Sequence, residues 1–215
     1  MNNNLQTLSE DRIKRDFFLT DVVDLAQKLL GKKIVRIIDG KYIICRIVET
    51  EAYKAPEDKA CHAYNNKKTE KTKFFWQIGG NLYVYSIYGN NMCMNITASD
   101  ADKPEAVLIR AVEPIRGIEI IKKLRKFENK KETPGNLKTL TDGPGKTGAS
   151  LDIDKSFNGV DLTNSDKIFL VDDEEYKFEV GVSKRINIDY AEEWKDKLWR
   201  FYVLNNVFVS KAPKK

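Results

Sequence analysis

The chain has 215 residues, of which 41% are apolar and 32% charged, so it is long enough for one well-buried domain and is neither disordered nor fibrous by composition. The formal net charge of +5 is compatible with a nucleic-acid partner but does not prove one. No apolar run approaches a membrane span and the first residues lack a secretory signal, so we expect no membrane partner and a cytoplasmic protein, nucleoid-associated if bacterial. Three widely spaced cysteines, Cys45, Cys61 and Cys93, argue against a disulfide scaffold and for a reducing compartment.

The first predicted elements are a helix and a hairpin. Residues 20–31 place apolar side chains at helical spacing, and Gly31 can end that helix. Residues 33–38 and 41–53 then predict two strands joined by Asp39-Gly40, because this dipeptide suits a two-residue turn with positive φ angles.

The remaining elements follow no strict alternation of strands and helices. Aromatic and β-branched content supports the strands, and a cluster of polar residues with Pro-Gly marks a loop. In chain order we expect strands over 83–89, 92–97 and 106–114, an amphipathic helix over 115–127, a polar loop over 128–138, a short helix within 143–153, and two or three further strands.

This order predicts an α+β fold: a single domain with a curved, mainly antiparallel or mixed β-sheet and flanking helices. We expect the domain to span residues 15–210, between a polar N-terminal tail over 1–14 and a basic C-terminal tail over 211–215.

Two acidic residues near the end of the second strand are the first candidates for function. Side chains alternate along a strand, so Glu49, Glu51 and Tyr53 are expected on one face. Acidic side chains that continue an apolar face are costly unless they are paired, solvated or used in chemistry. The alternative is that the strand end simply emerges into solvent, and the residues alone favour neither interpretation.

His62 is the only histidine, and a lone histidine is more often structural than catalytic. Cys61-His62 has no second ligand pair at zinc spacing, so we expect no metal. In the strand YVYSIYG, Tyr83 and Tyr85 share a face and Tyr88 lies on the other, next to a glycine. These tyrosines could pack in a core or stack on bases.

Charged residues supply three further observations. Arg110 lies within an apolar strand and needs a carboxylate or a phosphate as partner. The segment 142–147 ends in GKT but has Leu140 where a nucleotide-binding loop needs glycine, so we expect no ATP or GTP.

Lysines gather in three places, of which the first is expected to contact DNA phosphates. That first cluster is Lys67, Lys68, Lys71 and Lys73. The other two, which solubility explains equally well, are Lys122, Lys123, Arg125, Lys126, Lys130 and Lys131, and Lys211, Lys214 and Lys215.

Taken together, several long segments resemble the alkyladenine (3-methyladenine) DNA glycosylase family. They are RIVETEAY at 46–53, the ED…A.HAY region at 57–64, LYVYSIYGNNMCMNI at 82–96, LIRAVEP at 108–114, GPGK at 143–146 and RINIDYAEEW…LWRFYV at 185–203. The resemblance covers about residues 15–210 and implies a fold like that of the formyltransferase C-terminal domain.

The resemblance also implies a role for each matching residue. Glu51 resembles the general base that activates a water, and Arg110 the residue that helps to hold this water and the phosphate of the flipped nucleotide. The residues implied at the base are Tyr53, His62 and Tyr85 as pocket walls, Asn95 as the residue that crowds the 2-amino group of guanine, and Tyr88 as the wedge that fills the gap in the duplex.

The implied activity is that of a monofunctional purine DNA glycosylase for base excision repair. It would flip 3-methyladenine-class bases, with hypoxanthine as a harder substrate, out of duplex DNA and hydrolyse the N-glycosidic bond to leave an abasic site. We expect a monomer with no cofactor. Three positions depart from the family pattern: residues 69–72 read TEKT where many relatives have TPRN, Thr147 follows GPGK where leucine is frequent, and Asn187 replaces a common glycine.

Two alternatives belong to other functional classes. A non-catalytic binder of damaged DNA would keep Tyr88 and the lysines but would not need Glu51. A domain with the related formyltransferase-type fold could instead serve tRNA binding, because fold likeness alone does not set function.

Overall fold

Strand β2 (Lys41–Lys54) is the centre of an eight-stranded sheet in the computed structural model, which describes residues 10–87 and 91–210. Along one edge, β2 pairs first with β1 (Lys33–Ile38) and then with β8 (Arg200–Val203). Along the other edge it pairs with β5 (Glu105–Arg116) from Ile44 to Lys54. A strand with this many neighbours brings distant parts of the chain to one place.

The other strands extend the sheet on both sides of β2. The order is β3-β4-β5-β2-β1-β6, with β7 beside β8, and all described pairs are antiparallel. The additional strands are β3 (Leu82–Ile87), β4 (Asn91–Thr97), β6 (Ile168–Val171) and β7 (Val180–Ser183). The prediction of one α+β domain with a mainly antiparallel sheet is therefore confirmed, and its likeness to the formyltransferase domain stays a prediction.

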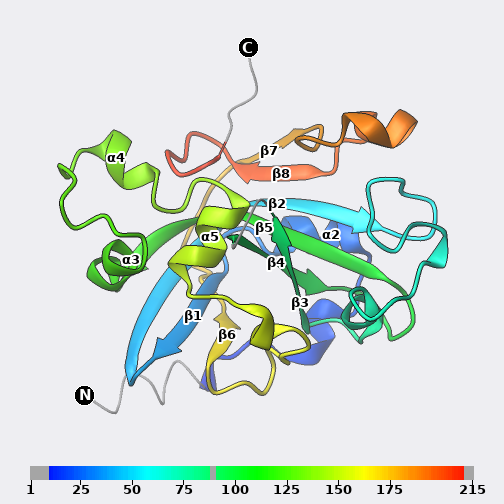
Figure 1. The fold of residues 1–215 in the computed structure, drawn as a ribbon, viewed down its shortest axis with the longest axis horizontal. Coiled ribbons are helices and arrows are strands. Elements are labelled where there is room, and N and C mark those ends of the chain that lie inside the picture. The colour runs from blue at the N-terminus through cyan, green and yellow to red at the C-terminus, as the bar shows by residue number, and fades with distance from the viewer. Residues whose placement is uncertain (1–9, 88–90, 211–215) are drawn as a thin grey trace.

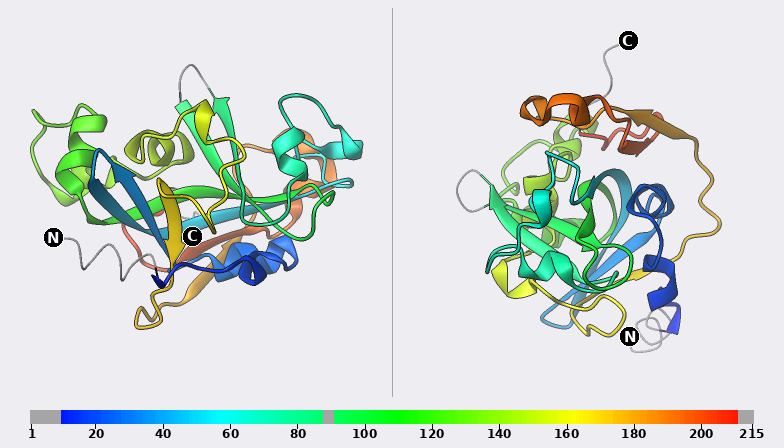
Figure 2. Two further views of the ribbon diagram at one scale, coloured as in Figure 1. Left: turned by 90° about the horizontal axis from the view of Figure 1, so that it is seen from below. Right: turned by 90° about the vertical axis from the view of Figure 1, so that its right-hand side faces the viewer.

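Helices cover both faces of the sheet. Helix α2 (Val22–Lys28) and helix α5 (Pro144–Ser150) lie on opposite sides of it, as Figures 1 and 2 show. The close packing of α5 on β4 depends on Gly148, because a Cβ there would lie 2.1 Å from the carbonyl oxygen of Met92. The remaining α-helices are α3 (Ile118–Leu124) and α4 (Pro134–Lys138), and 3-10 turns span Arg15–Phe18, Tyr64–Asn66, Lys73–Trp76, Lys155–Phe157 and Asp189–Asp196.

The predicted hairpin is confirmed, and the predicted first helix is present but ends at Lys28 instead of extending to Gly31. Asp39 and Gly40 have φ angles of 47° and 69°, which a two-residue hairpin turn requires. Helix α2 begins after Asp21, whose carboxylate accepts a hydrogen bond from the backbone amide of Val23 over 2.8 Å.

Two predictions between residues 115 and 138 need correction. The expected helix over 115–127 is shorter, because β5 continues to Arg116 and Gly117, with a φ of 81°, separates the strand from α3. The expected loop over 128–138 contains α4 at its end. Thr133 caps this helix by accepting a hydrogen bond from the Asn136 amide, and Pro134 suits the first helical position.

A small aromatic cluster forms part of the core on the side that carries the functional site. Phe75 and Tyr83 are buried together with alanines and Cys61, and Tyr53 and Tyr85 pack against them. The three cysteines are free and buried. This cluster gives the sheet a largely apolar wall on that side.

The ends of the chain extend past the described residues. Ile13 is buried, and its amide donates to the carbonyl oxygen of Leu170 over 2.9 Å, so the sheet holds the end of the expected N-terminal tail. The basic cluster Lys211, Lys214 and Lys215 lies outside the described residues. Within residues 10–87 and 91–210, every helix is too short or too polar to form a transmembrane span.

Candidate active site

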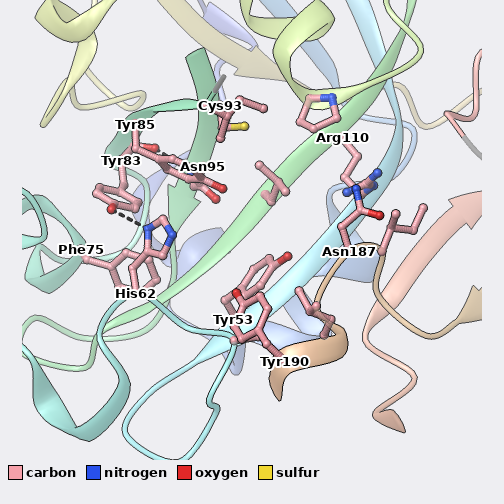
Figure 3. A pocket seen from close by; sticks show the side chains of 16 residues that line it. Tyr53, His62, Phe75, Tyr83, Tyr85, Cys93, Asn95, Arg110, Asn187 and Tyr190 are labelled. Atoms are coloured by element: carbon pink, nitrogen blue, oxygen red, sulfur yellow. Dashed lines mark hydrogen bonds between the residues drawn. The ribbon is translucent and has the colours of Figure 1, made fainter. Parts of the chain in front are cut away.

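An aromatic cavity of about 180 Å³ lies above β2, β3, β4 and β5 (Figure 3). The sheet and the loops that cross its edge both contribute side chains. The lining residues are Tyr53, Ala60, His62, Phe75, Tyr83, Tyr85, Ile87, Cys93, Asn95, Leu108, Arg110, Pro144, Ile186, Asn187, Ile188 and Tyr190. Four of the predicted pocket residues, Tyr53, His62, Tyr85 and Asn95, are thus brought together with Arg110.

The guanidinium of Arg110 joins the two acidic residues of β2. Its Nε donates to Glu49 Oε1 over 2.8 Å and its Nη1 donates to Glu51 Oε2 over 3.1 Å. The ladder between β2 and β5 is irregular on both sides of Glu49, where Arg110 has no residue directly opposite. Both carboxylates are fully buried, so the alternative in which the strand end emerges into solvent is wrong.

Glu51 lies directly behind the cavity wall. Besides the bond from Arg110, its carboxylate accepts hydrogen bonds from the Tyr53 hydroxyl over 2.8 Å and the Ile186 amide over 2.7 Å. A carboxylate offers about four acceptor positions, so three are occupied and about one remains. The residue is therefore held in one orientation with acceptor capacity left for a further donor.

Glu49 is saturated by comparison. Oε1 accepts from Arg110, from Arg200 Nε over 2.7 Å and from the Ser210 hydroxyl over 2.9 Å, and Oε2 accepts from the Ser210 amide over 2.6 Å. Burial raises the pKa of Glu49, but the two guanidinium groups and Ser210 outweigh burial and bring it below its ordinary value. Glu49 is consequently a structural anchor for Arg110.

Tyr53 connects the carboxylate to the aromatic wall. Burial, followed by the nearby charge of Glu51, raises the pKa of its phenol well above the ordinary value, so the hydroxyl stays protonated and donates to Glu51. Behind the ring, Arg185 stacks 4.7 Å from the centroid and forms a fully buried double ion pair with Asp58 at 2.6 and 2.8 Å. This pair fixes both the ring and the segment that follows Arg185.

The opposite wall is built around His62. Its Nδ1 lies 2.9 Å from the Tyr83 hydroxyl, and its ring meets Tyr85 edge to face with centroids 4.5 Å apart. Although His62 is exposed at the mouth of the cavity, desolvation by the surrounding protein lowers its pKa. The imidazole is therefore neutral at neutral pH.

Asn95 is buried on β4 at the inner side of the cavity. Its amide nitrogen donates to the carbonyl oxygen of Tyr83 over 2.9 Å, which fixes the side chain against the neighbouring strand. Cys93 lies beside it, and burial raises the pKa of that thiol to about 11. At neutral pH Cys93 is thus a thiol rather than a nucleophilic thiolate.

The predicted lysines fall into two groups. Lys68 and Lys73 pair with Asp102 at 3.5 Å and Glu70 at 2.7 Å. Lys67 and Lys71 form no ion pair within the described part of the chain and line a groove of about 570 Å³. This groove shares His62, Tyr83 and Tyr85 with the aromatic cavity, and Lys155 joins it from a distant segment.

Comparison with known proteins identifies the family. The family model described as methylpurine-DNA glycosylase matches residues 16–207. This chain belongs to that family. A relative from Natranaerobius thermophilus is 48% identical over 93% of this chain and 98% of its own length, and one from Clostridium novyi is 49% identical over 93% and 98%. Both carry the name "putative 3-methyladenine DNA glycosylase".

Tyr88, which the family resemblance implies as the wedge, lies outside the described residues. Over residues 10–87 and 91–210, no group of three histidine, cysteine, aspartate or glutamate side chains is arranged to hold a metal ion.

Several site residues of this glycosylase family member are indicated by no local sequence pattern. The Asp58–Arg185 pair and Arg200 join segments far apart in the chain, so no local pattern reveals them. Tyr83, by contrast, was expected on the same strand face as Tyr85, and it lines the cavity as well. Asn187 was noted only as a departure from a glycine.

Proposed function

We propose that this chain is a monofunctional DNA glycosylase that excises alkylated purines of the 3-methyladenine class from duplex DNA. The observation that carries the proposal is the position of Glu51, a buried carboxylate held by Tyr53, Arg110 and Ile186 directly behind an aromatic cavity. The hydrolysis would leave an abasic site for base excision repair.

The cavity suits a flat, cationic base. A base within a duplex is inaccessible, so the enzyme would extrude the nucleotide and place the base between Tyr53 and the pair His62 and Tyr85. An aromatic face stabilises a cation by about 0.5–2 kcal/mol. Because His62 is neutral and Arg110 is compensated by Glu49 and Glu51, the cavity presents no uncompensated positive charge of its own.

Hydrolysis follows from the free acceptor position on Glu51. A water that donates to this carboxylate attacks C1′ as the glycosidic bond breaks, and the bonding electron pair leaves with the cationic purine, which becomes neutral. Glu51 takes the proton of the water and stabilises the positive charge that develops on the sugar. None of the described residues that line the cavity is a lysine, and the thiol of Cys93 is protonated, which favours water as nucleophile.

Two further residues would contribute, one to base selectivity and one to extrusion of the base from the stack. Asn95 is fixed on β4 where a 2-amino group would crowd it, so guanine is disfavoured. Tyr88 would fill the gap left in the stack. Hypoxanthine is a harder substrate because it is neutral and requires a proton donor to the purine ring.

The groove beside the cavity would hold the DNA backbone. Lys67, Lys71 and Lys155 line it without ion pairs among the described residues, so their charges are available to phosphates. Lys68 and Lys73, also expected to contact DNA, would first have to leave their acidic partners. We propose that a monomer binds the duplex in this way.

The test is base excision by Glu51→Gln. Duplex DNA that contains 3-methyladenine or hypoxanthine is incubated with the protein without added metal or ATP, and abasic sites are detected by alkaline cleavage. Because a general base contributes about 10²–10⁴-fold, we expect at least a 100-fold loss with retained DNA binding. Glu57→Gln, the same change at an exposed residue, serves as the control and keeps activity.

The opposite result assigns another function. If the wild type bound damaged DNA but released no base from either substrate, the chain would be a damage-binding protein. If both variants excised equally well, Glu51 would not be the base.

A further inference from the structure

Asn187 has a backbone conformation that favours glycine. Its φ angle is 61°, in the left-handed region, where non-glycine residues are uncommon and asparagine is among the best tolerated. The residue is exposed and lines the aromatic cavity. A side chain at this position therefore costs backbone energy and places an amide at the cavity mouth.

The side-chain amide of Asn187 has no hydrogen-bond partner among the residues that the structure describes. The residues before it are firmly held, since Arg185 pairs with Asp58 and the Ile186 amide donates to Glu51. The backbone that carries Asn187 is thus held in place. When the Asn187 side chain binds a ligand, the entropy lost is therefore little more than that of its own side-chain rotation.

The position of Asn187 favours contact with the sugar–phosphate backbone of a flipped nucleotide rather than with its base. Asn187 and Arg110 lie on one side of the cavity, whereas Asn95 and Tyr85 lie on the other (Figure 3). Glu51, which the proposed hydrolysis requires close to C1′, lies behind the Arg110 side. A flipped nucleotide therefore presents its sugar and flanking phosphates to Asn187.

At this side of the cavity Arg110 keeps only two of its five N–H groups for a phosphate. All three nitrogens of that guanidinium already donate, to Glu49, Glu51 and Ser210 at 2.8, 3.1 and 3.3 Å, and two carboxylates oppose its charge. The amide nitrogen of Asn187 is neutral, exposed and uncommitted.

We infer that the amide of Asn187 donates a hydrogen bond to a non-bridging oxygen of a phosphate that flanks the flipped nucleotide. The inference rests on the proposed function and adds a binding residue to it. Asn187 would strengthen binding of any flipped nucleotide, whatever its base, and would leave the hydrolytic step unchanged.

Asn187→Gly tests the contact without endangering the fold, because glycine relieves the left-handed backbone. The probe is duplex DNA with a tetrahydrofuran abasic analogue, which removes the base from the measurement. We expect the dissociation constant to rise about tenfold, with single-turnover excision at saturation unchanged. Asn187→Asp, which sets a carboxylate against the phosphate, should bind more weakly still.

Asn205→Gly is the matched control. Asn205 is also exposed with a φ of 60°, but it lies outside the cavity, so its replacement should leave binding unchanged. Replacing each phosphate that flanks the lesion by a neutral methylphosphonate, one at a time, then identifies the phosphate that Asn187 contacts. At the right phosphate, this neutral group should weaken wild-type binding and have little further effect on Asn187→Gly.

The outcomes separate the two proposals. Binding by Asn187→Gly equal to that of the wild type, or equal methylphosphonate losses in both proteins at every position, would overturn the contact while excision still upheld the glycosylase. Failure of the wild type to excise any base would instead reject the proposed function. A shift in the preference among bases, with binding to the abasic analogue unchanged, would place Asn187 at the base and also overturn the inference.

Discussion

Glu49 and Arg110 form a buried ion pair that sets the position of Glu51. Nε of Arg110 donates to Glu49 over 2.8 Å, and Nη1 of the same planar group donates to Glu51 over 3.1 Å. Because a guanidinium holds its donors in a fixed fork, anchoring one side of it orients the other. Glu49 is therefore a positioning residue, although it does not line the cavity.

Replacement of Glu49 should cost considerable stability. Glu49→Gln removes the negative charge that faces Arg110 and Arg200, and the loss of one partner from a buried ion pair typically costs about 3–5 kcal/mol. Urea unfolding followed by circular dichroism measures the change. Glu113→Gln, which breaks a half-buried pair with Arg46, should cost about 1 kcal/mol or less. Equal losses in the two variants would contradict the anchoring role.

Removal of the Tyr53 hydroxyl should affect the hydrolytic step more than binding. Tyr53→Phe keeps the ring that lines the cavity and deletes the hydrogen bond to Glu51. A hydrogen bond to a charged group contributes about 1.5–3 kcal/mol, so kcat on 3-methyladenine DNA should fall about tenfold or more while KM changes little. Tyr176→Phe, outside the aromatic cavity, is the control. An unchanged kcat with a raised KM would show that the hydroxyl serves binding instead.

Lowering the pH should reduce both the stability of the fold and the rate at which cationic bases are excised, because His62 becomes protonated. Its pKa is lowered in the folded state, so the unfolded chain binds the proton first as pH falls from about 6.5. Stability is complete above that pH and is lost as pH falls through the folded pKa. Protonated His62 would also repel a cationic base.

The measurement is the melting temperature and kcat/KM between pH 7.5 and 5. His62→Asn retains a polar atom near the Tyr83 hydroxyl but does not titrate, so both quantities should depend less on pH in this variant. Glu49, whose pKa is lowered, adds its own loss only below its ordinary value of 4.5, outside this range. An identical pH dependence in the two proteins would exclude His62 as the responsible group.

Local signals in the sequence were sufficient for much of the fold. The Asp39-Gly40 turn and the capped helix α2 depend on interactions within a few residues, and both were predicted correctly. The cap Thr133 of α4 carries the same kind of local signal, but it lies within a polar segment that predicted a loop. Strand β5 continues past its predicted end at Pro114 because Arg116 pairs with Ile44 of β2, a long-range contact that no local signal specifies.

The sequence by itself thus determined the α+β class, the order of most elements and the motifs that contain Glu51, Tyr53, His62 and Tyr85. Only the tertiary structure decided how the charges are paired. Glu49 meets Arg110, Arg200 and Ser210 across 61, 151 and 161 residues of chain. Such contacts depend on strand register and on the irregular pairing around Glu49, which arise from packing of the whole sheet and leave no pattern in any local stretch of sequence.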